Sequence, residues 1–261
     1  MNAPVVQLGA AGLRLGDRAL WDELDLTIDA GQFVAILGPN GSGKTSLLRV
    51  LTGQLALTSG TVLIEGQPVS AGRSNVGYIP QHRTERGQTM RGRDLVQLGV
   101  DGHRWGLTGR RAARRQRDLA VQRALGEVGA SHLDRTPLSV MSGGELQRLR
   151  IAQALAGDPV LLLCDEPLLN LDPASAQHVS ELIDKRRHEA STAVLFVTHD
   201  INPVLPFVDR VLYLVDGRFR IGAVDEVMTS ENLSALYRSA VDVVRVHGQY
   251  VVVGNRGFCH E

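Results

Sequence analysis

The sequence predicts an α/β fold organised around one strand, one glycine-rich loop and one helix. The apolar run FVAIL at 33–37 is too short for a stable helix and fits a buried strand. The loop GPNGSGKT follows at 38–45, and residues 46–52 then carry leucines at helical spacing. Two more apolar runs, at 160–164 and 193–198, fit further buried strands, which are typical of sheets covered by helices.

The loop at 38–45 matches the pattern G-x-x-x-x-G-K-[ST] at every fixed position. Its glycines let successive backbone N–H groups point into one concavity, and the start of the next helix adds a positive dipole there. We therefore expect Lys44 to reach the outer phosphates of a nucleotide and the Thr45 hydroxyl to lie on Mg²⁺. The alternative is a glycine-rich turn that merely precedes a helix, and the register of glycines, Lys and Thr argues against it.

Length, charge and cysteine content limit the class of protein. The chain has 261 residues, a formal net charge of zero and two cysteines. This length allows one large domain or two modest ones, and the neutral charge argues against a dedicated nucleic-acid binder. Cys164 and Cys259 give no disulfide framework, which fits a reducing cytoplasm. We find no secretory signal and no apolar run near the ~20 residues that span a bilayer, so a membrane role requires another chain.

Turn signals divide the rest of the chain into strands. Residues 5–37 are expected to be β-rich, with a turn at Gly16-Asp17 between segments at 13–15 and 24–28 that alternate with period two. Another strand is expected at 61–65. A short apolar segment at 76–81 ends in Gln81. Asp216-Gly217 is a hairpin signal, and residues 241–253 are expected to form a terminal hairpin.

An arginine-rich stretch begins at about residue 82. Its arginines cluster at the head of a predicted helix, namely Arg110, Arg111, Arg114, Arg115 and Arg117. A solvated helix face is our interpretation, with a polyanion site as the alternative, because Asp118, Glu127 and Asp134 interrupt the basic stripe.

Ser142 and Glu145 form the pattern of a capping box at the start of a helix. Gly143 and Gly144 occupy its first turn, where each glycine costs about 1 kcal/mol relative to Ala. A purely structural helix start does not need that penalty. Small residues here indicate close approach of a group to the backbone N–H, and at a helix N-terminus we expect that group to be anionic.

Polar residues stand where two predicted buried strands end. Asp165 and Glu166 follow the run at 160–164, at the carboxyl end where open α/β sheets bind ligands. His199 follows the run at 193–198. Taken singly, Asp165 and Glu166 could mark a strand end that enters solvent, and His199 could be an ordinary surface histidine. Because these residues occur together with a phosphate loop, we favour a functional site. Cys164 is interpreted as a small core residue.

In this order, the motifs resemble the nucleotide-binding subunit of ABC transporters over about residues 5–253. The most specific element is SGGELQR at 142–148, which is similar to the ABC signature. The resemblance implies a P-loop NTPase (RecA-like) core with an antiparallel β subdomain and an inserted α-helical subdomain carrying the signature. It divides the chain into a first core part with the β subdomain at 1–82, a helical subdomain at 83–151, a second core part at 152–225 and a C-terminal extension at 226–261.

The resemblance also implies ATP and Mg²⁺ as cofactors and assigns roles. Glu166 is the implied general base, His199 contacts the γ-phosphate, and Lys44 and Gln81 complete the catalytic set. The implied Mg²⁺ ligands are Thr45, Gln81 and Asp165. The implied nucleotide contacts are Gly38, Pro39, Asn40, Gly41, Ser42, Gly43, Lys44, Thr45, Ser46, Ser142, Gly143, Gly144 and Asp172.

In this family two ATP-binding subunits pair head to tail. Ser142 and Gly144 of one subunit are then expected to complete the site around ATP held by Lys44 of the other, which we expect to be an identical chain. The other implied partners are membrane permease subunits and, indirectly, a solute-binding protein, with no nucleic acid. The implied location is the cytoplasmic face of the cell membrane, as a peripheral protein.

The sequence departs from the family pattern at three places. Leu15 stands near the position where an aromatic residue usually stacks on adenine. Trp21 is a possible substitute, although we interpret it as a core residue. Glu145 stands where Gln is commoner, and Leu169 where Ser is frequent. These changes affect expected base stacking and ATP affinity more than hydrolysis.

The C-terminal part, at 194–205 and 236–246, is similar to subunits of zinc and manganese importers, so metal import is our first hypothesis. Another importer's ATPase, for siderophores or small solutes, and an exporter remain alternatives. A non-transport ABC protein is a weaker one, because the chain has one cassette, no heptads and no cysteine cluster. A C-terminal metal sensor could be drawn from His247, Cys259, His260 and Glu261, but their spacing fits no ligand pattern.

Overall fold

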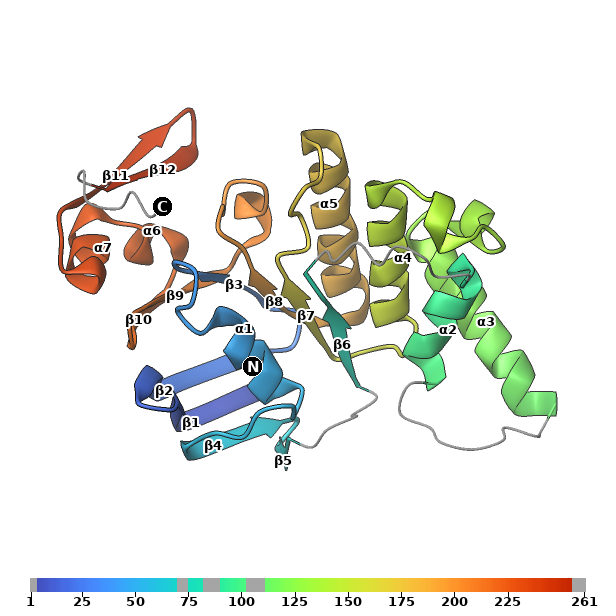
Figure 1. The fold of residues 1–261 in the computed structure, drawn as a ribbon, viewed down its shortest axis with the longest axis horizontal. Coiled ribbons are helices and arrows are strands. Elements are labelled where there is room, and N and C mark those ends of the chain that lie inside the picture. Colours follow the sequence, from blue (N-terminus) through green and yellow to red (C-terminus); the bar gives the residue numbers. More distant parts are fainter. Residues whose placement is uncertain (1–3, 70–74, 82–89, 102–110, 255–261) are drawn as a thin grey trace. The chain divides into compact units, whose positions relative to one another are not determined.

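The computed structural model describes residues 4–69, 75–81, 90–101 and 111–254 (Figure 1). The chain forms two compact units. The first unit combines Met1–Val69 with Leu195–Glu261, and the second unit is Ser70–Val194. Among the described residues, no helix has the length and apolar character needed to cross a membrane.

The first unit contains an antiparallel sheet with strand order β2-β1-β4-β5 (Figure 1). Its strands are β1 (Pro4–Leu15), β2 (Arg18–Asp29), β4 (Ser59–Ile64) and β5 (Gln67–Pro68). The predicted turn at Gly16 joins β1 and β2, and Gly16 has a φ of 58°. Leu24, Leu26 and Ile28 of β2 are buried and alternate with exposed residues, which is the period-two pattern that the sequence indicates. The expected antiparallel β subdomain is therefore present.

The core of the first unit lies around β3 (Phe33–Leu37), whose five residues are all buried. Strand β3 pairs in parallel with β9 (Arg210–Val215), and β9 pairs antiparallel with β10 (Arg218–Gly222). Asp216 and Gly217 connect β9 to β10 with φ values of 42° and 80°, as expected of the predicted hairpin turn. These parallel strands confirm the α/β class.

The first unit also holds helices and a separate hairpin. The predicted terminal hairpin is confirmed and forms a two-stranded sheet. These elements are α1 (Lys44–Leu51), the 3₁₀ turn η3 (Leu205–Phe207), α6 (Val224–Val227), α7 (Ser230–Tyr237), β11 (Val241–Val246) and β12 (Gln249–Gly254).

The second unit combines two parallel strands with helices. Strand β6 pairs with β7 in parallel, so that Ile79 lies opposite Cys164. Cys164 is fully buried, as interpreted from the sequence, and this burial raises the pKa of its thiol. The elements are β6 (Val76–Ile79), α2 (Gly92–Asp101), α3 (Arg111–Glu127), η1 (Ser131–Leu133), η2 (Leu138–Val140), α4 (Gly143–Leu155), β7 (Leu161–Asp165) and α5 (Pro173–Ala190). Strand β8 (Ala193–Val197) runs from this unit into the first.

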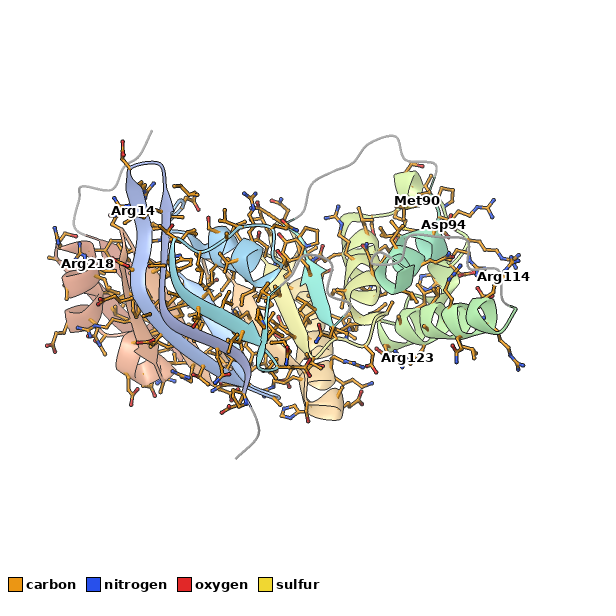
Figure 2. All side chains as sticks on the ribbon, turned by 90° about the horizontal axis from the view of Figure 1, so that it is seen from below. Arg14, Met90, Asp94, Arg114, Arg123 and Arg218 are labelled. Atoms are coloured by element: carbon orange, nitrogen blue, oxygen red, sulfur yellow. The ribbon has the colours of Figure 1, made fainter. Side chains whose placement is uncertain are left out.

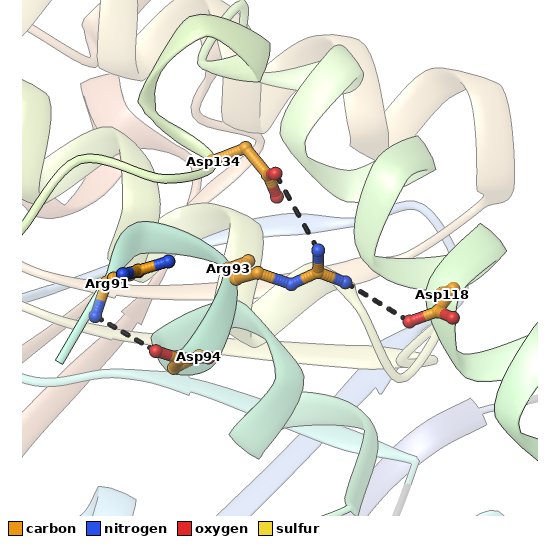
Figure 3. A network of polar contacts seen from close by, with 5 residues as sticks. All are labelled: Arg91, Arg93, Asp94, Asp118 and Asp134. Carbon is orange, nitrogen blue, oxygen red and sulfur yellow. Dashed lines mark hydrogen bonds and ion pairs between the residues drawn. The ribbon is translucent and has the colours of Figure 1, made fainter.

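Arg93 of α2 forms ion pairs with carboxylates of two later segments (Figure 3). Its guanidinium lies 3.2 Å from Asp118 of α3 and 3.8 Å from Asp134, which follows η1. The backbone N–H of Arg91 donates to Asp94 at the start of the same helix, at 3.1 Å. Two of the carboxylates that interrupt the basic stripe in the sequence therefore neutralise an arginine of α2.

Several arginines of α3 are exposed. Figure 2 places Arg114 and Arg123 on this helix. Arg114 and Arg123 are exposed, and Arg123 is 3.5 Å from Glu127 one turn further on. This arrangement agrees with a solvated helix face. Arg110 lies outside the described residues.

We expect Arg93→Met to lower the stability of the helical part. The change removes both ion pairs and leaves Asp118 and Asp134 without that cation, at a cost of about 1 kcal/mol and a fall in melting temperature of roughly 2–4 °C. Thermal unfolding followed by circular dichroism measures this. Arg114→Met is the matched control on α3 and should leave the melting temperature unchanged; equal losses in both variants would contradict the prediction.

Candidate nucleotide-binding site

The loop Gly38–Thr45 joins the end of β3 to the start of α1 in the first unit. Lys44 is the first residue of the helix, and its side chain is buried. Its ammonium nitrogen Nζ donates to the carbonyl oxygens of Gly38 at 2.7 Å and Pro39 at 2.8 Å. Because both carbonyls belong to the loop, they hold the positive charge of Lys44 within the loop's curve.

The backbone conformation of the loop is restricted by residues that pack against Gly38 and Gly43. Gly38 and Gly43 have φ values of 137° and 101°, in the region that favours glycine. A Cβ on Gly43 would lie 2.9 Å from the indole nitrogen Nε1 of Trp21, and one on Gly38 would lie 2.0 Å from the carbonyl oxygen of Leu214. Only glycine fits between these neighbours and the open side of the loop.

The loop residues fit a phosphate group. The hydroxyl of Ser42 is buried and has no hydrogen-bond partner among the described residues. A buried polar group of this kind normally finds a partner, and a phosphate oxygen in the loop would provide one. The N-terminus of α1 and the Lys44 ammonium supply positive charge at the same place. The expectation of a phosphate cradle at 38–45 is consistent with this local geometry.

We expect Gly43→Ala to weaken nucleotide binding and to lower stability. The new methyl group meets Trp21 at a distance that real side chains do not tolerate, and a left-handed φ adds about 1–2 kcal/mol of strain. Equilibrium dialysis with radiolabelled ATP and a melting curve measure the two effects.

Gly126→Ala on α3 is the control, because a Cβ there has nothing within 4 Å. It should stabilise the protein by roughly 0.5–1 kcal/mol, since Ala is the better helix former. Unchanged ATP affinity in the Gly43 variant would contradict the role given to the Trp21 contact.

An acidic pair and an amide lie together in the second unit. Asp165 is the last residue of β7 and is buried, and Glu166 follows it with a φ of 48°. The side-chain amide of Gln81 donates to the Glu166 carboxylate at 2.9 Å. Because β6 and β7 are parallel, their carboxyl ends meet at one edge of the sheet. The structure therefore brings Gln81, Asp165 and Glu166 together.

Tyr78 is a member of this cluster that the sequence did not single out. Its hydroxyl lies 3.1 Å from the carboxylate oxygen Oδ2 of Asp165 and donates to it. Since Asp165 is buried, such donors offset part of the cost of keeping its carboxylate away from water. The sequence did contain a signal for this contact: a tyrosine stands in an otherwise apolar strand, and a buried tyrosine hydroxyl usually has a hydrogen-bond partner.

A second helix start in the second unit carries the sequence SGGE. Ser142 caps α4: its backbone N–H and its hydroxyl each donate to the Glu145 carboxylate at 2.8 Å, and the Glu145 N–H donates back to the Ser142 hydroxyl at 3.3 Å. The predicted capping box is confirmed. The hydrogen bonds from Ser142 hold the pKa of Glu145 below its usual value, so Glu145 stays negatively charged.

An open cavity of about 670 Å³ lies at this helix start. Asp172 caps α5 within the cavity wall, accepting hydrogen bonds from the backbone N–H of Ser175 at 3.0 Å and from its hydroxyl at 2.6 Å. The structure thus brings Asp172 together with the signature residues. The lining residues are Ser142, Gly143, Gly144, Glu145, Arg148, Asn170, Leu171, Asp172, Ala174, Ser175, His178 and Val179.

His199 lies in the first unit, two residues after the end of β8. The backbone N–H of Thr198 donates to the carbonyl of Ile36 in β3 at 3.1 Å. His199 therefore follows a strand that runs beside the strand leading into the phosphate loop. Within this unit, the structure places Lys44, Thr45 and His199 at the carboxyl ends of neighbouring strands.

Neither residue considered for base stacking is an exposed aromatic group. Leu15 is aliphatic and half exposed, while Trp21 is fully buried against Gly43. The interpretation of Trp21 as a core residue is correct. Among the described residues, no group of three or more His, Cys, Asp or Glu side chains could hold a metal ion. Of the residues weighed as a metal sensor, Cys259, His260 and Glu261 lie outside that range.

Known proteins share both the sequence and the fold. The family model for ABC transporter matches residues 21–169, more than half of the 261-residue chain. The aliphatic sulfonates import ATP-binding protein of Nocardia farcinica is 34% identical over 254 residues, covering 96% of this chain and 93% of that protein. The zinc import ATP-binding protein of Alkalilimnicola ehrlichii is 33% identical over 249 residues, covering 94% and 82%.

A solved inward-facing structure of a metal-chelate type ABC transporter has a TM-score of 0.81 at 24% identity, covering 98% of this chain and 99% of that chain. Other relatives, 30% to 35% identical, are named for import of hypophosphite, hemin and phosphonates. The chain belongs to the ABC transporter family. It is an ATP-binding subunit of that family, an ATPase that uses ATP with Mg²⁺.

Proposed function

We propose that this chain powers an importer by pairing head to tail with an identical ATP-binding subunit beneath a membrane permease. The observation that carries the pairing is the cavity at Ser142. Within the second unit, it offers an anion the N-terminal N–H groups of α4 and a hydroxyl, and its glycines leave room for that anion to approach the backbone. The nucleotide that this cavity contacts would be held by the loop of the partner subunit.

The residues on the loop side of the proposed nucleotide site have distinct tasks. Lys44 and the N–H groups of the loop bind the β- and γ-phosphates, and His199 contacts the γ-phosphate. Thr45, Asp165 and Gln81 would hold Mg²⁺, which would supply charge neutralisation to the phosphates. The four segments at 1–82, 83–151, 152–225 and 226–261 remain the proposed division of the chain.

Glu166 is the proposed general base. A carboxylate at a strand end can accept a proton from water that attacks the γ-phosphate, provided that its orientation is fixed. The hydrogen bond from Gln81 to one carboxylate oxygen orients the Glu166 side chain. Gln81 lies two residues beyond the end of β6. Movement of this residue by the permease would change the orientation of the base, which links transport to hydrolysis.

The proposed substrate is a metal ion, zinc or manganese, imported from a solute-binding protein through the permease. Support comes from the likeness of 194–205 and 236–246 to metal-importer subunits and from the zinc-import relative. Relatives named for sulfonates, hemin and phosphonates match at similar identity, so another solute is the alternative. The ATPase itself is proposed to lie at the cytoplasmic face of the membrane.

Glu166→Gln should bind ATP, lose turnover by at least about a hundredfold and accumulate as a dimer, because the base is lost while the phosphate contacts remain. Adding Ser142→Glu should abolish that ATP-induced dimer without changing ATP binding to the monomer. Light scattering on a sizing column gives the molar mass with and without ATP. Lys44→Ala should lose ATP binding itself.

These variants separate the two parts of the proposal. A Glu166→Gln protein with unchanged ATPase rate would refute the general-base role. A dimer that persists after Ser142→Glu would refute the head-to-tail site while leaving nucleotide binding by the loop in place.

Deletion of the gene in its source organism tests the substrate. We expect growth under zinc or manganese limitation to fail, and to be restored by the wild-type gene but not by the Glu166→Gln variant. Uptake of radioactive zinc and manganese provides the direct measurement. Normal growth on limiting metal, combined with failure on a sulfonate as the sole sulfur source, would overturn the metal assignment.

A further inference from the structure

We propose that Arg18 is a further nucleotide-binding residue, supplying a second positive charge to the phosphates beside Lys44. Arg18 is the first residue of β2 and lies outside the phosphate loop in the sequence. The proposal rests on the loop 38–45 being the nucleotide site. It adds a group to that site which the motif does not contain.

The guanidinium of Arg18 lies beside the middle of the loop. A Cβ on Gly41 would be 3.5 Å from one terminal nitrogen of Arg18, Nη1, and 4.0 Å from the other, Nη2. Arg18 and Gly41 both belong to the first unit. The side chain of Arg18 is 57% exposed, so its charge lies at the open rim of the loop. A phosphate bound in the loop would lie within reach of this guanidinium.

The hairpin register fixes the face on which Arg18 lies. Arg18 pairs with Leu15 across β1 and β2, and Arg14 pairs with Ala19. Residues that face each other across strands share a side of the sheet, whereas successive residues alternate. Leu15 and Arg18 are therefore on one face and Arg14 on the other. A shift of one residue in register would take the guanidinium away from the loop.

Asp216 is the other neighbour of Arg18. Nη2 of Arg18 lies 3.5 Å from the Asp216 carboxylate oxygen Oδ1, in the turn between β9 and β10, and the Asp216 side chain is 72% exposed. Exposed ion pairs of this length contribute little to stability. A phosphate offers a stronger, charge-assisted bond to the planar guanidinium. Arg18 can therefore exchange the carboxylate for a phosphate oxygen, with Asp216 as the competing anion.

The pair formed by Arg245 and Asp225 is a matched control. It lies in the same unit, its nitrogen–oxygen distance is 3.4 Å, and its side chains are 56% and 77% exposed. Arg18 lies beside the loop 38–45, whereas Arg245 lies over the ring of Tyr250, 5.3 Å from its centroid. Equal effects of removing Arg18 and Arg245 would therefore reflect general charge rather than a contact.

The test measures the dissociation constants of ATP and of inorganic tripolyphosphate, without Mg²⁺, by calorimetry. Arg18→Ala should raise both constants by about three- to tenfold, whereas Arg245→Ala should leave both unchanged. Asp216→Asn should leave the constants unchanged or lower them, because it removes the competing anion. Melting curves verify that all variants are folded.

Three outcomes would overturn the proposal. Unchanged constants in Arg18→Ala would show that the guanidinium does not reach the ligand. A loss for ATP with none for tripolyphosphate would assign Arg18 to the base instead of the phosphates. Weakening by Asp216→Asn as large as that by Arg18→Ala would make the ion pair structural.

Binding by the wild-type chain distinguishes a failure of the Arg18 proposal from a failure of the loop assignment. If the wild-type chain itself bound neither ATP nor tripolyphosphate, the loop assignment and the Arg18 proposal would both fall. If wild type binds, Lys44→Ala shows the loss expected when the loop's lysine is removed, and the effect of Arg18→Ala is judged against that loss.

Discussion

The nucleotide site depends on the packing of a buried indole against the underside of a glycine loop. Trp21 leaves no space for a side chain at Gly43, and the Leu214 carbonyl leaves none at Gly38. These neighbours force the loop backbone outward into a curve, and the curve lets the Gly38 and Pro39 carbonyls hold the Lys44 ammonium. The position of the Lys44 charge, which is proposed to bind phosphate, thus follows from core packing and not from the surface of the protein.

In the second unit, neighbouring side chains hold two carboxylates in place. Asp165 is buried and needs donors, and Tyr78 supplies one from the adjacent strand. Glu166, one residue later, has a left-handed backbone and accepts a hydrogen bond from Gln81. Backbone strain of this kind persists at functional sites because surrounding contacts hold it in place. The parallel pairing of β6 and β7 is what lets three side chains from two segments meet.

Features encoded in short stretches were predictable from the sequence. The buried strand at 33–37, the hairpin at Asp216 and the capping box of Ser142 with Glu145 each depend on local residue types, and the structure confirms them. The α/β class and the family followed from the order of such motifs.

Contacts between distant segments were not predictable in this way. Tyr78 reaches Asp165 across a strand pair, and Arg18 at the start of β2 lies beside Gly41 in the loop after β3. Each contact depends on how strands pack and not on a sequence pattern. The same holds for Arg93, which joins carboxylates 25 and 41 positions further along the chain, at Asp118 and Asp134. A single sequence contains the residues of such contacts but does not indicate which of them meet.

The burial of Trp21 makes the chain suitable for optical measurement. The sequence has two tryptophans, and this one has no exposed surface and lies in contact with the phosphate loop. Indole emission is sensitive to the polarity and charge of its surroundings, and here the indole lies against Gly43 of the loop. With Trp105 replaced by Phe, the fluorescence of the unlabelled protein would report directly on what occupies the loop.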